Sequence, residues 1–319
     1  MHSRHGAIAG DGQPGRPVPV HTYSIVARDP QTGQLGVAVQ SHYFSVGSIV
    51  TWAEAGVGAI ATQSFARVDY GPEGLALMRQ GYTADQALRQ LVQQDEHREV
   101  RQVAMVDSRG NVAVHTGSRC IAAAGHAVGE QFSVQANLMV DDTVWPAMKR
   151  AYEQAQGDLA DRLVAALQAG QAAGGDIRGQ QSAAILVVSG ERSDKPWEGR
   201  LFDLRVEDHP RPVEELKRLV QLRRAYMLND LSDELMAEGK FEEAAQAMSE
   251  AIRLAPDVVE MRFWAAVGLF TAGREEQALS MFREVFSTEP VWAELVPRLV
   301  PAGLLPDDPQ ALKRILSQS

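Results

Sequence analysis

The sequence predicts an α+β protein, with a sandwich of two mainly antiparallel sheets covered by helices, followed by an all-α helical repeat domain. Strand patterns and helix patterns come in groups rather than in strict alternation, which argues against a doubly wound parallel sheet. After Pro212 the pattern is almost wholly helical, and 319 residues suit two domains better than one. We therefore expect a leader at residues 1–21, an α+β domain at 22–212 and a helical domain at 213–319.

Two hairpins open the predicted α+β domain. The first has turn chemistry at its tip, because Pro30 presets φ and Gly33 tolerates positive φ. We expect the second hairpin to continue the same antiparallel meander. The four expected strands are 22–29, 34–41, 46–52 and 57–63.

The hydrophobic period then changes to that of helices. One expected helix begins after Thr83 and has Gln86 three residues on, which is a capping box, and another is preceded by Asp158 as N-cap. Together with these two, the helices expected in this part of the chain are 71–80, 83–94, 143–154 and 159–171. The expected strands are 102–107, 111–116, one near 132–140, 182–188 and 201–206.

A 34-residue repeat is present in the helical region. Small residues where two helices cross, and a terminal Pro, are typical of the tetratricopeptide helix-turn-helix unit at this spacing. Two units bury little apolar surface, so we expect the helix 213–224 and the segment 292–316 to cap them. The positions in register are Gly239, Ala244 and Pro256 with Gly273, Ala278 and Pro290, Met248 with Phe282, and Leu235 with Leu269.

Stacked hairpins of this kind present a concave groove, which we expect to contain Leu228, Leu231, Arg262 and Ala266. Residues 213–319 carry 12 basic and 18 acidic side chains, a net charge of −6. A basic or mixed peptide, or a second copy of the protein, is the expected partner of that groove. The alternative is that the repeat helices simply pack on the first domain.

Charge and composition exclude several functions. The chain has 31 basic and 41 acidic residues and no basic cluster, so neither nucleic acid nor an anionic membrane is an expected partner. The single cysteine, Cys120, allows neither an intramolecular disulfide nor a cysteine-based metal cage. The leader holds four Gly, three Pro and no apolar core, so we expect it to lack fixed structure and the protein to be cytoplasmic. No metal or cofactor is expected.

Polar residues gather at one edge of the predicted meander. In antiparallel strands the start of the first and third strands and the end of the second and fourth lie at the same edge. This edge therefore collects hydroxyl, amide and imidazole groups, as a binding or catalytic site requires, although polar strand ends also occur for solvation alone. The residues placed there are Thr22, Gln40, Ser41, His42, Ser45, Gln63 and Ser64.

Four sequence blocks resemble a known family. They are Thr22–Asp29 (TYSIVARD), Gly36–Ser41 (GVAVQS), Ala55–Gln63 (AGVGAIATQ) and Gly174–Ser182 (GGDIRGQQS), within a similarity that covers about residues 22–212. Together they are similar to the bacterial domain-of-unknown-function family 1028. The resemblance implies the four-layer αββα sandwich of the N-terminal-nucleophile (Ntn) hydrolase superfamily. Family members commonly begin at or just before the residue that matches Thr22, and the superfamily places a Thr, Ser or Cys nucleophile at the start of the first strand.

The chemistry of such a site can be stated for these residues. The Thr22 hydroxyl is a weak nucleophile until a base takes its proton, and an N-terminal Thr22 would use its own α-amine, whose pKa is near 8. Backbone N–H groups at Gln63–Ser64 could stabilise the oxyanion, and Asn137 or Ser182 could add a donor. While His21 precedes it, Thr22 has no free amine, so this route requires cleavage of the bond between them or a different translation start, and no Met lies between Met1 and Thr22. The alternative is that Thr22 is an ordinary strand threonine.

Other candidates and functions stay open. Asp176 and Arg178, in a Gly-rich loop, could bind a charged end of the substrate or could simply pin the loop. The histidines His115 and His126 lie at strand ends without a third metal ligand. The first hypothesis is a hydrolase of a small-molecule or peptide-like amide. The second is a non-catalytic binding or scaffolding protein that keeps the fold and uses the repeats for protein contacts.

Overall fold

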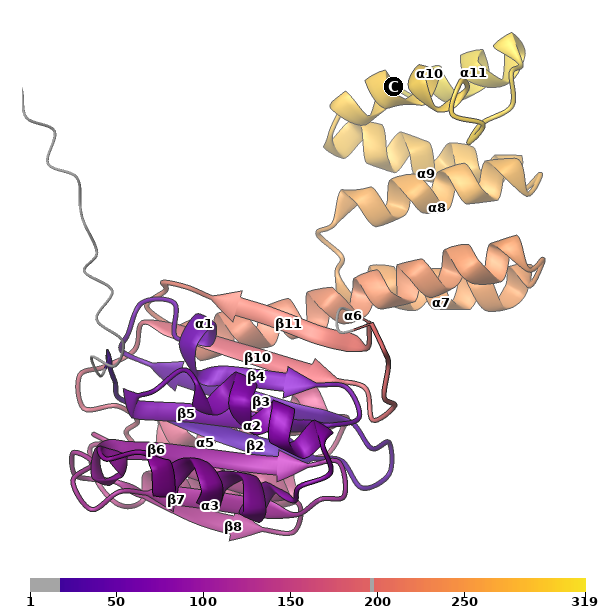
Figure 1. The fold of residues 1–319 in the computed structure, drawn as a ribbon. Coiled ribbons are helices and arrows are strands. Elements are labelled where there is room, and N and C mark those ends of the chain that lie inside the picture. The colour runs from indigo at the N-terminus through magenta and orange to yellow at the C-terminus, as the bar shows by residue number, and fades with distance from the viewer. Residues whose placement is uncertain (1–17, 196–197) are drawn as a thin grey trace, which may run out of the picture. The chain divides into compact units, whose positions relative to one another are not determined.

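The computed structural model describes residues 18–195 and 198–319, which form two compact units (Figure 1). The first unit extends to Arg218 and the second spans Leu219–Ser319. The boundary between the units falls inside a helix, slightly after the boundary expected at residue 212. The first unit is mixed α/β with two antiparallel sheets, and the second is helical.

One sheet of the first unit has the strand order β1-β5-β6-β7, and β4 also pairs with β5. The second sheet has the order β11-β10-β3-β2-β9-β8. All strand pairs are antiparallel. The strands of the first sheet are β1 Val18–Val20, β4 Thr51–Glu54, β5 Gly58–Ala66, β6 Arg101–Asp107 and β7 Val112–Thr116. Those of the second are β2 Thr22–Arg28, β3 Leu35–Ser41, β8 Gly125–Gly129, β9 Phe132–Ala136, β10 Ser182–Val188 and β11 Arg200–Val206.

The two sheets face each other, and helices pack on their outer sides. Along β5, Ala59 and Ala61 point into the core shared with β2, β3 and β10, whereas Ile60 points to the helix side. Small side chains on the inner face allow close packing of the two sheets. Helices α2 (Tyr70–Arg79) and α3 (Ala84–Gln94) cover the first sheet, and α4 (Val144–Gln154) and α5 (Leu159–Ala172) cover the second.

Local capping signals are confirmed. The Thr83 side chain accepts a hydrogen bond from the backbone N–H of Gln86, and the Gln86 side chain accepts one from the N–H of Thr83. Asp158 caps α5 through the N–H of Asp161. A short 3₁₀ helix, η1 (Arg98–Val100), leads from α3 towards β6.

The single meander expected from the first four strands is wrong. The expected strand 46–52 is replaced by a short helix, α1 (Gly47–Val50), and by the shorter β4, and both β4 and β5 belong to the other sheet from β2 and β3. The chain must cross between layers here, and Gly47 allows it because a Cβ at that position would lie 2.5 Å from the Ala184 side chain. The polar edge therefore combines strand ends from two facing sheets.

The leader prediction is wrong at its last residues. Val18–Val20 form strand β1, which pairs with β5 in the register Val20↔Ser64, and Val20 and His21 are buried. Backbone hydrogen bonds to an existing sheet provide the ordering that composition alone did not predict. The prediction for residues 1–17 lies outside the described residues.

Two helical hairpins in the second unit repeat at the predicted 34-residue interval. Gly239 and Gly273 each end a helix with φ of +77°, which favours glycine. Ala244 and Ala278 are both fully buried at the start of the following helix. The hairpins are α6 (Pro212–Ala237) with α7 (Phe241–Leu254), and α8 (Val259–Thr271) with α9 (Glu275–Thr288).

The ends of the repeat region differ from the expectation. The capping helix expected at 213–224 and the first helix of the first hairpin form one continuous helix, α6, because no Gly or Pro interrupts the segment. The C-terminal cap consists of α10 (Val291–Leu299) and α11 (Pro309–Leu316). Ala266 does not line a groove as expected, since it is fully buried in the core of α8 and α9, whereas Leu231 is 43% exposed.

Candidate functional site

The peptide bond between His21 and Thr22 lies at the centre of the polar edge. Thr22 is fully buried, and its hydroxyl donates a hydrogen bond to the carbonyl oxygen of Val20 at 3.1 Å. Thr22 is the first residue of β2, which pairs with β3 on one side and β9 on the other. The candidate nucleophile is therefore paired with Ser41 of β3, and its own carbonyl accepts from the N–H of Asn137, directly after β9.

The carbonyl oxygen of His21 accepts two hydrogen bonds from side chains. The Ser41 hydroxyl donates at 2.5 Å and Nη2 of Arg178 donates at 2.9 Å. Ser41 is placed by the β2–β3 ladder, in which it lies opposite Thr22. These two side chains are therefore donors to the carbonyl that immediately precedes Thr22. The backbone N–H groups of Gln63–Ser64, expected to stabilise the oxyanion of a substrate, stay a prediction.

Arg178 is oriented by the carboxylate of Asp176. Nε and Nη2 of Arg178 donate to the two carboxylate oxygens at 3.0 and 2.7 Å, and the Asp176 side chain is fully buried. The backbone N–H of His42 also donates to Asp176, at 3.3 Å. Gly174 and Gly175 adopt φ of +112° and +62°, so the loop can turn tightly enough to aim this pair at His21. The predicted Asp–Arg pair therefore contacts the backbone of the site as well as its own loop.

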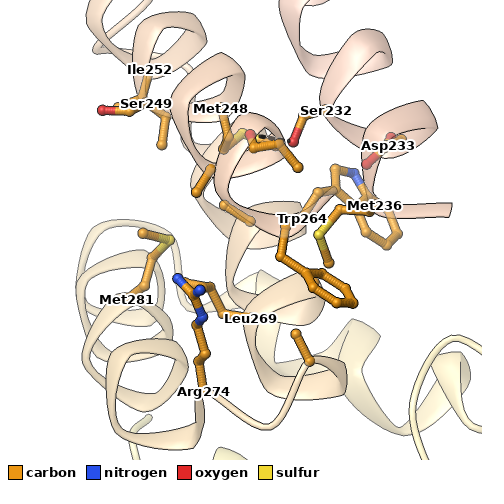
Figure 2. A pocket seen from close by; sticks show the side chains of 16 residues that line it. Ser232, Asp233, Met236, Met248, Ser249, Ile252, Trp264, Leu269, Arg274 and Met281 are labelled. Atoms are coloured by element: carbon orange, nitrogen blue, oxygen red, sulfur yellow. Dashed lines mark hydrogen bonds between the residues drawn. The ribbon is translucent and has the colours of Figure 1, made fainter. Parts of the chain in front are cut away.

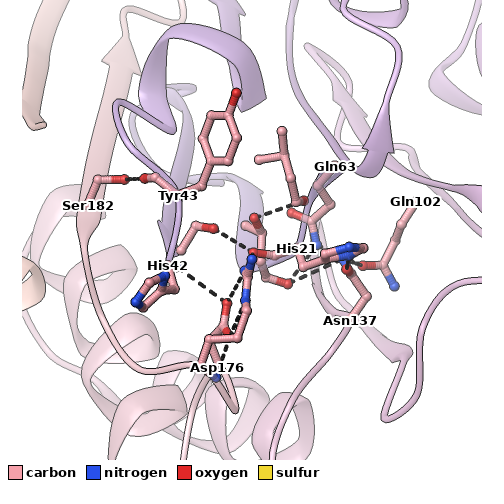
Figure 3. Close-up of polar contacts among 12 residues, drawn as sticks. His21, His42, Tyr43, Gln63, Gln102, Asn137, Asp176 and Ser182 are labelled. Atoms are coloured by element: carbon pink, nitrogen blue, oxygen red, sulfur yellow. Dashed lines mark hydrogen bonds and ion pairs between the residues drawn. The ribbon is translucent and has the colours of Figure 1, made fainter. Parts of the chain in front are cut away.

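A network of buried amides holds the other side of the bond (Figure 3). The carbonyl oxygen of Thr22 accepts from the backbone N–H of Asn137 at 3.0 Å and from the side-chain amides of Gln63 and Asn137 at 3.3 and 3.4 Å. Both amides also donate to Oε1 of Gln102, at 2.7 and 2.9 Å. Gln63 comes from one sheet and Asn137 follows β9 of the other, so the network links the two layers.

Gln102 is one of the residues of this network that the sequence interpretation missed; Ser24 and Gln135, which bond to Gln63, are others. Gln102 is fully buried at the start of β6 and lies opposite Gln63 in the ladder. Its Nε2 is also within 3.2 Å of Thr116 and of the backbone oxygens of Gly125 and Ala136. The available signal was a polar amide directly before the apolar run Val103–Val106 of β6, and its role is visible only when β6 is paired with β5.

The His21 ring is enclosed by the same network. Its Nδ1 lies 2.9 Å from Oδ1 of Asn137, and the ring meets Phe65 edge-to-face with centroids 5.4 Å apart. Burial lowers the pKa of His21 below 6.5, against the raising effect of the Asn137 hydrogen bond, while Arg178 lowers it further. The imidazole is therefore held mainly in its neutral form.

The side chains of four of the predicted residues lie outside these contacts. The amide of Gln40 is buried on the opposite face of β3 from Ser41 and has no hydrogen-bond partner among the described residues. His42 is exposed and contributes its backbone N–H. The Ser182 hydroxyl donates to the carbonyl of Tyr43 and accepts from the N–H of Val46, so it holds the chain after β3. Ser64 is buried with φ of +70°.

The other histidines do not form a metal site in the described parts of the chain. His115 contacts the carbonyl of Arg98, His126 contacts the hydroxyl of Thr116, and no group of three or more His, Cys, Asp or Glu side chains converges in residues 18–195 and 198–319. Burial raises the pKa of the Cys120 thiol, which donates to the carbonyl of Arg101. Within the same ranges, no helix has the length and apolar character needed to cross a bilayer.

The helical unit contains a cavity of about 190 Å³ between its hairpins (Figure 2). Its walls are mainly apolar, with Met236, Met248 and Met281 around Trp264, and Arg274 reaches the same space. None of the expected groove residues Leu228, Leu231, Arg262 or Ala266 lines it. Arg262 instead donates to the carbonyl of Pro256.

The fold and the site together define a two-sheet α/β protein with a buried polar centre at the start of β2. Residues 22–216 match the family model described as a family of unknown function, DUF1028, and the chain belongs to this family. It is also similar to the crystal structure of a Silicibacter pomeroyi protein of the same family, with 32% identity and a TM-score of 0.57, over 63% of this chain and 88% of that one. No curated protein matches the sequence.

Proposed function

We propose that the first unit is an Ntn-type hydrolase of an amide or peptide-like bond, in which Thr22 becomes the N-terminal nucleophile when the His21–Thr22 bond is cleaved. The sandwich of two sheets between helix layers supports the assignment to this superfamily. No cofactor takes part in this proposal. The substrate class is a small-molecule or peptide-like amide.

One observation carries the proposal: the carbonyl preceding Thr22 accepts hydrogen bonds from Ser41 and Arg178. Negative charge develops on this oxygen when a nucleophile attacks the carbon, and preorganised donors stabilise that charge. The Arg178 donor is cationic, which strengthens the bond as the charge grows. An ordinary strand carbonyl would be paired with a backbone N–H of the neighbouring strand.

The proposed cleavage is a rearrangement of the His21–Thr22 bond itself. The Thr22 oxygen attacks the His21 carbonyl carbon, and the C–N bond between His21 and Thr22 breaks. The leaving nitrogen takes the proton of the Thr22 hydroxyl and becomes the α-amine of Thr22. Water then hydrolyses the resulting ester, which leaves a carboxylate on His21 and a free hydroxyl on Thr22. The new amine, with a pKa near 8, serves as the base in later reactions.

The test is the intact mass of the purified full-length protein over time. We expect a species that begins at Thr22, and we expect Thr22→Ala to stay uncleaved under the same conditions. Arg178→Gln should slow the appearance of this species at least tenfold, since it removes a charged donor to the oxyanion. Wild-type protein that stays at full mass would refute the proposed nucleophile.

A second candidate function is a non-catalytic binding or scaffolding protein. The enclosure of His21 and Thr22, which are 5% and 0% exposed in the uncleaved chain, favours it, because a substrate cannot reach a buried hydroxyl. The same mass measurement separates the two functions. A stable uncleaved chain supports the scaffold.

We infer that the helical unit is tetratricopeptide-like and takes a protein partner or a second copy of the chain. Its 34-residue repeat, its net charge of −6 and the apolar cavity between its hairpins support this role. The net negative charge of the whole chain disfavours nucleic acid and anionic membranes as partners, and a cytoplasmic location is consistent with this assignment.

A further inference from the structure

The residues before Thr22 occupy part of one edge of β5. On that edge, β4 pairs with Gly58–Ala61 and β1 pairs with Ser64–Ala66, whereas β6 pairs with the other edge. Removal of β1 would leave backbone N–H and C=O groups of β5 without partners beside the amide network. Unpaired backbone groups of this kind can form hydrogen bonds with an added strand, and an exposed strand edge is a common site for binding an extended peptide.

The residue next to the scissile bond has a defined environment. His21 is 5% exposed, with its ring against Phe65 and its Nδ1 on Asn137, and its carbonyl between Ser41 and Arg178. This arrangement orients one side chain and one carbonyl relative to Thr22. A carboxylate formed at the same place would accept a charge-assisted hydrogen bond from Arg178.

Backbone strain marks the same place. Ser64, directly opposite Val20, and Leu138, directly after Asn137, adopt φ of +70° and +59°. Residues with a side chain rarely adopt such φ values, and backbone strain of this kind clusters at binding and catalytic sites. The strained residues follow the two amide residues that hold the Thr22 carbonyl.

We propose that the edge Ser64–Ala66 of β5 binds the acyl side of a peptide substrate as an added antiparallel strand, and that residues 18–21 occupy this site in the uncleaved chain. This inference specifies the substrate of the proposed hydrolase and rests on that proposed function. The substrate class is a peptide extended for at least three residues before the scissile amide. The side chain of the last residue before the scissile amide takes the position of the His21 ring. The carboxylate of the product accepts hydrogen bonds from Ser41 and Arg178.

The experiment measures binding of the peptide Val-Pro-Val-His, labelled with fluorescein through an N-terminal Gly-Gly linker, by fluorescence anisotropy. Every protein is full length and carries Thr22→Ala, so that no cleavage occurs. In the test variant, Val20→Asp places a charge at a fully buried position and expels β1 from the edge. The matched control is Val128→Asp, the same change at a valine that is 45% exposed.

We expect the Val20→Asp variant to bind the peptide at least tenfold more tightly than the Val128→Asp control, in which residues 18–21 still occupy the edge. The scrambled peptide His-Val-Pro-Val should bind at least tenfold more weakly. A C-terminal amide in place of the carboxylate should weaken binding about tenfold, since the charge-assisted bond to Arg178 is lost. Equal binding by the test and control variants, in folded samples, would overturn the strand site.

Circular dichroism of each variant shows whether it is folded. If Val20→Asp loses the native spectrum, Val20→Ser weakens the same strand without a charge, and its affinity must again exceed that of the control. The outcome is independent of catalysis, because binding is measured without cleavage. If the chain binds the peptide but never cleaves itself, the strand site is supported and the proposed nucleophile is refuted. If the chain cleaves itself but does not bind the peptide, only the strand site is refuted.

Discussion

At the scale of single residues, the site depends on one carbonyl and one hydroxyl. The His21 carbonyl has two side-chain donors, and the Thr22 hydroxyl lies on the same strand, bonded to Val20. The surrounding amides of Gln63 and Asn137 hold the next carbonyl along the chain. Because these buried groups are paired with one another, we expect each of the side chains that make the pairs to be sensitive to substitution.

Thr22→Ala should abolish the proposed cleavage and lower the free energy of unfolding by about 1–2 kcal/mol, because one buried hydrogen bond and one small group are lost. Thr22→Ser, which keeps the hydroxyl, should retain part of the cleavage rate. Intact mass gives the rate, and urea denaturation gives the stability. A loss of more than about 4 kcal/mol would identify Thr22 as a structural residue.

Acidification should loosen residues 18–21. The pKa of His21 is lowered from 6.5 by burial, so the unfolded state binds more protons than the native state between the native pKa and 6.5. The free energy of unfolding therefore rises with pH across this window. The part of it that depends on neutral His21 is fully present above pH 6.5 and is lost as the pH falls through the window. Hydrogen exchange at the amides of Ser64–Ala66 reports the change.

His21→Gln is the control for this pH dependence, because glutamine does not titrate in this range. Exchange of the Ser64–Ala66 amides in that variant should stay constant from pH 7 to pH 5, after correction for the intrinsic exchange rate. A wild-type protein with equally constant exchange would contradict the role assigned to the imidazole.

At the scale of elements, a buried ion pair supports the strand that carries the site. Nε of Arg101, in β6, donates to Asp95 at 2.8 Å, both side chains are 4% exposed, and Tyr70 of α2 donates to the same carboxylate. Arg101 also donates to the carbonyl of Phe65 in β5 at 2.6 Å. The pair thus joins α2, the end of α3 and two strands beside His21.

Asp95→Asn should lower the free energy of unfolding by about 3 kcal/mol, because it leaves the Arg101 charge buried without its partner. Burial alone would raise the pKa of Asp95, but hydrogen bonds from Arg101 and the N–H of His97 hold it below 3.8. The contribution of the ionised Asp95 to the free energy of unfolding is therefore present above pH 3.8 and is lost as the pH falls below that value. Urea denaturation at pH 7 and pH 3 checks both statements.

The matched control is Asp69→Asn, which breaks the pair of Arg67 with Asp69 at the surface. The Asp69 side chain is 58% exposed, so the loss should stay below about 1 kcal/mol. Similar losses for Asp69→Asn and Asp95→Asn would show that burial of the Asp95 pair has no energetic consequence.

At the scale of the whole molecule, the boundary between the two units falls inside α6. A chain that ends at Arg218 should keep the first unit folded. A chain that ends at Pro212 should melt at a lower temperature, because it loses Val213 and Leu216, which are 2% and 0% exposed. Differential scanning calorimetry compares the two chains, and identical melting temperatures would place the boundary at residue 212.

The sequence predicted those features that depend on neighbouring residues. The capping box at Thr83 and Gln86, the alternating strand patterns and the 34-residue spacing of Gly239 and Gly273 all arise from local backbone preferences. Family membership was also predicted, from contiguous blocks such as Gly174–Ser182, and the family model matches residues 22–216.

Only the tertiary structure decided which strands share a sheet, and therefore which polar residues meet. Gln102 was overlooked because its role depends on its pairing with Gln63, which lies far from it in the sequence. Val18–Val20 were expected to lack structure, yet the edge of β5 supplies the hydrogen bonds that order them. Propensity and composition act within a few residues of the chain, whereas pairing and burial are settled only when all the strands compete for the same partners.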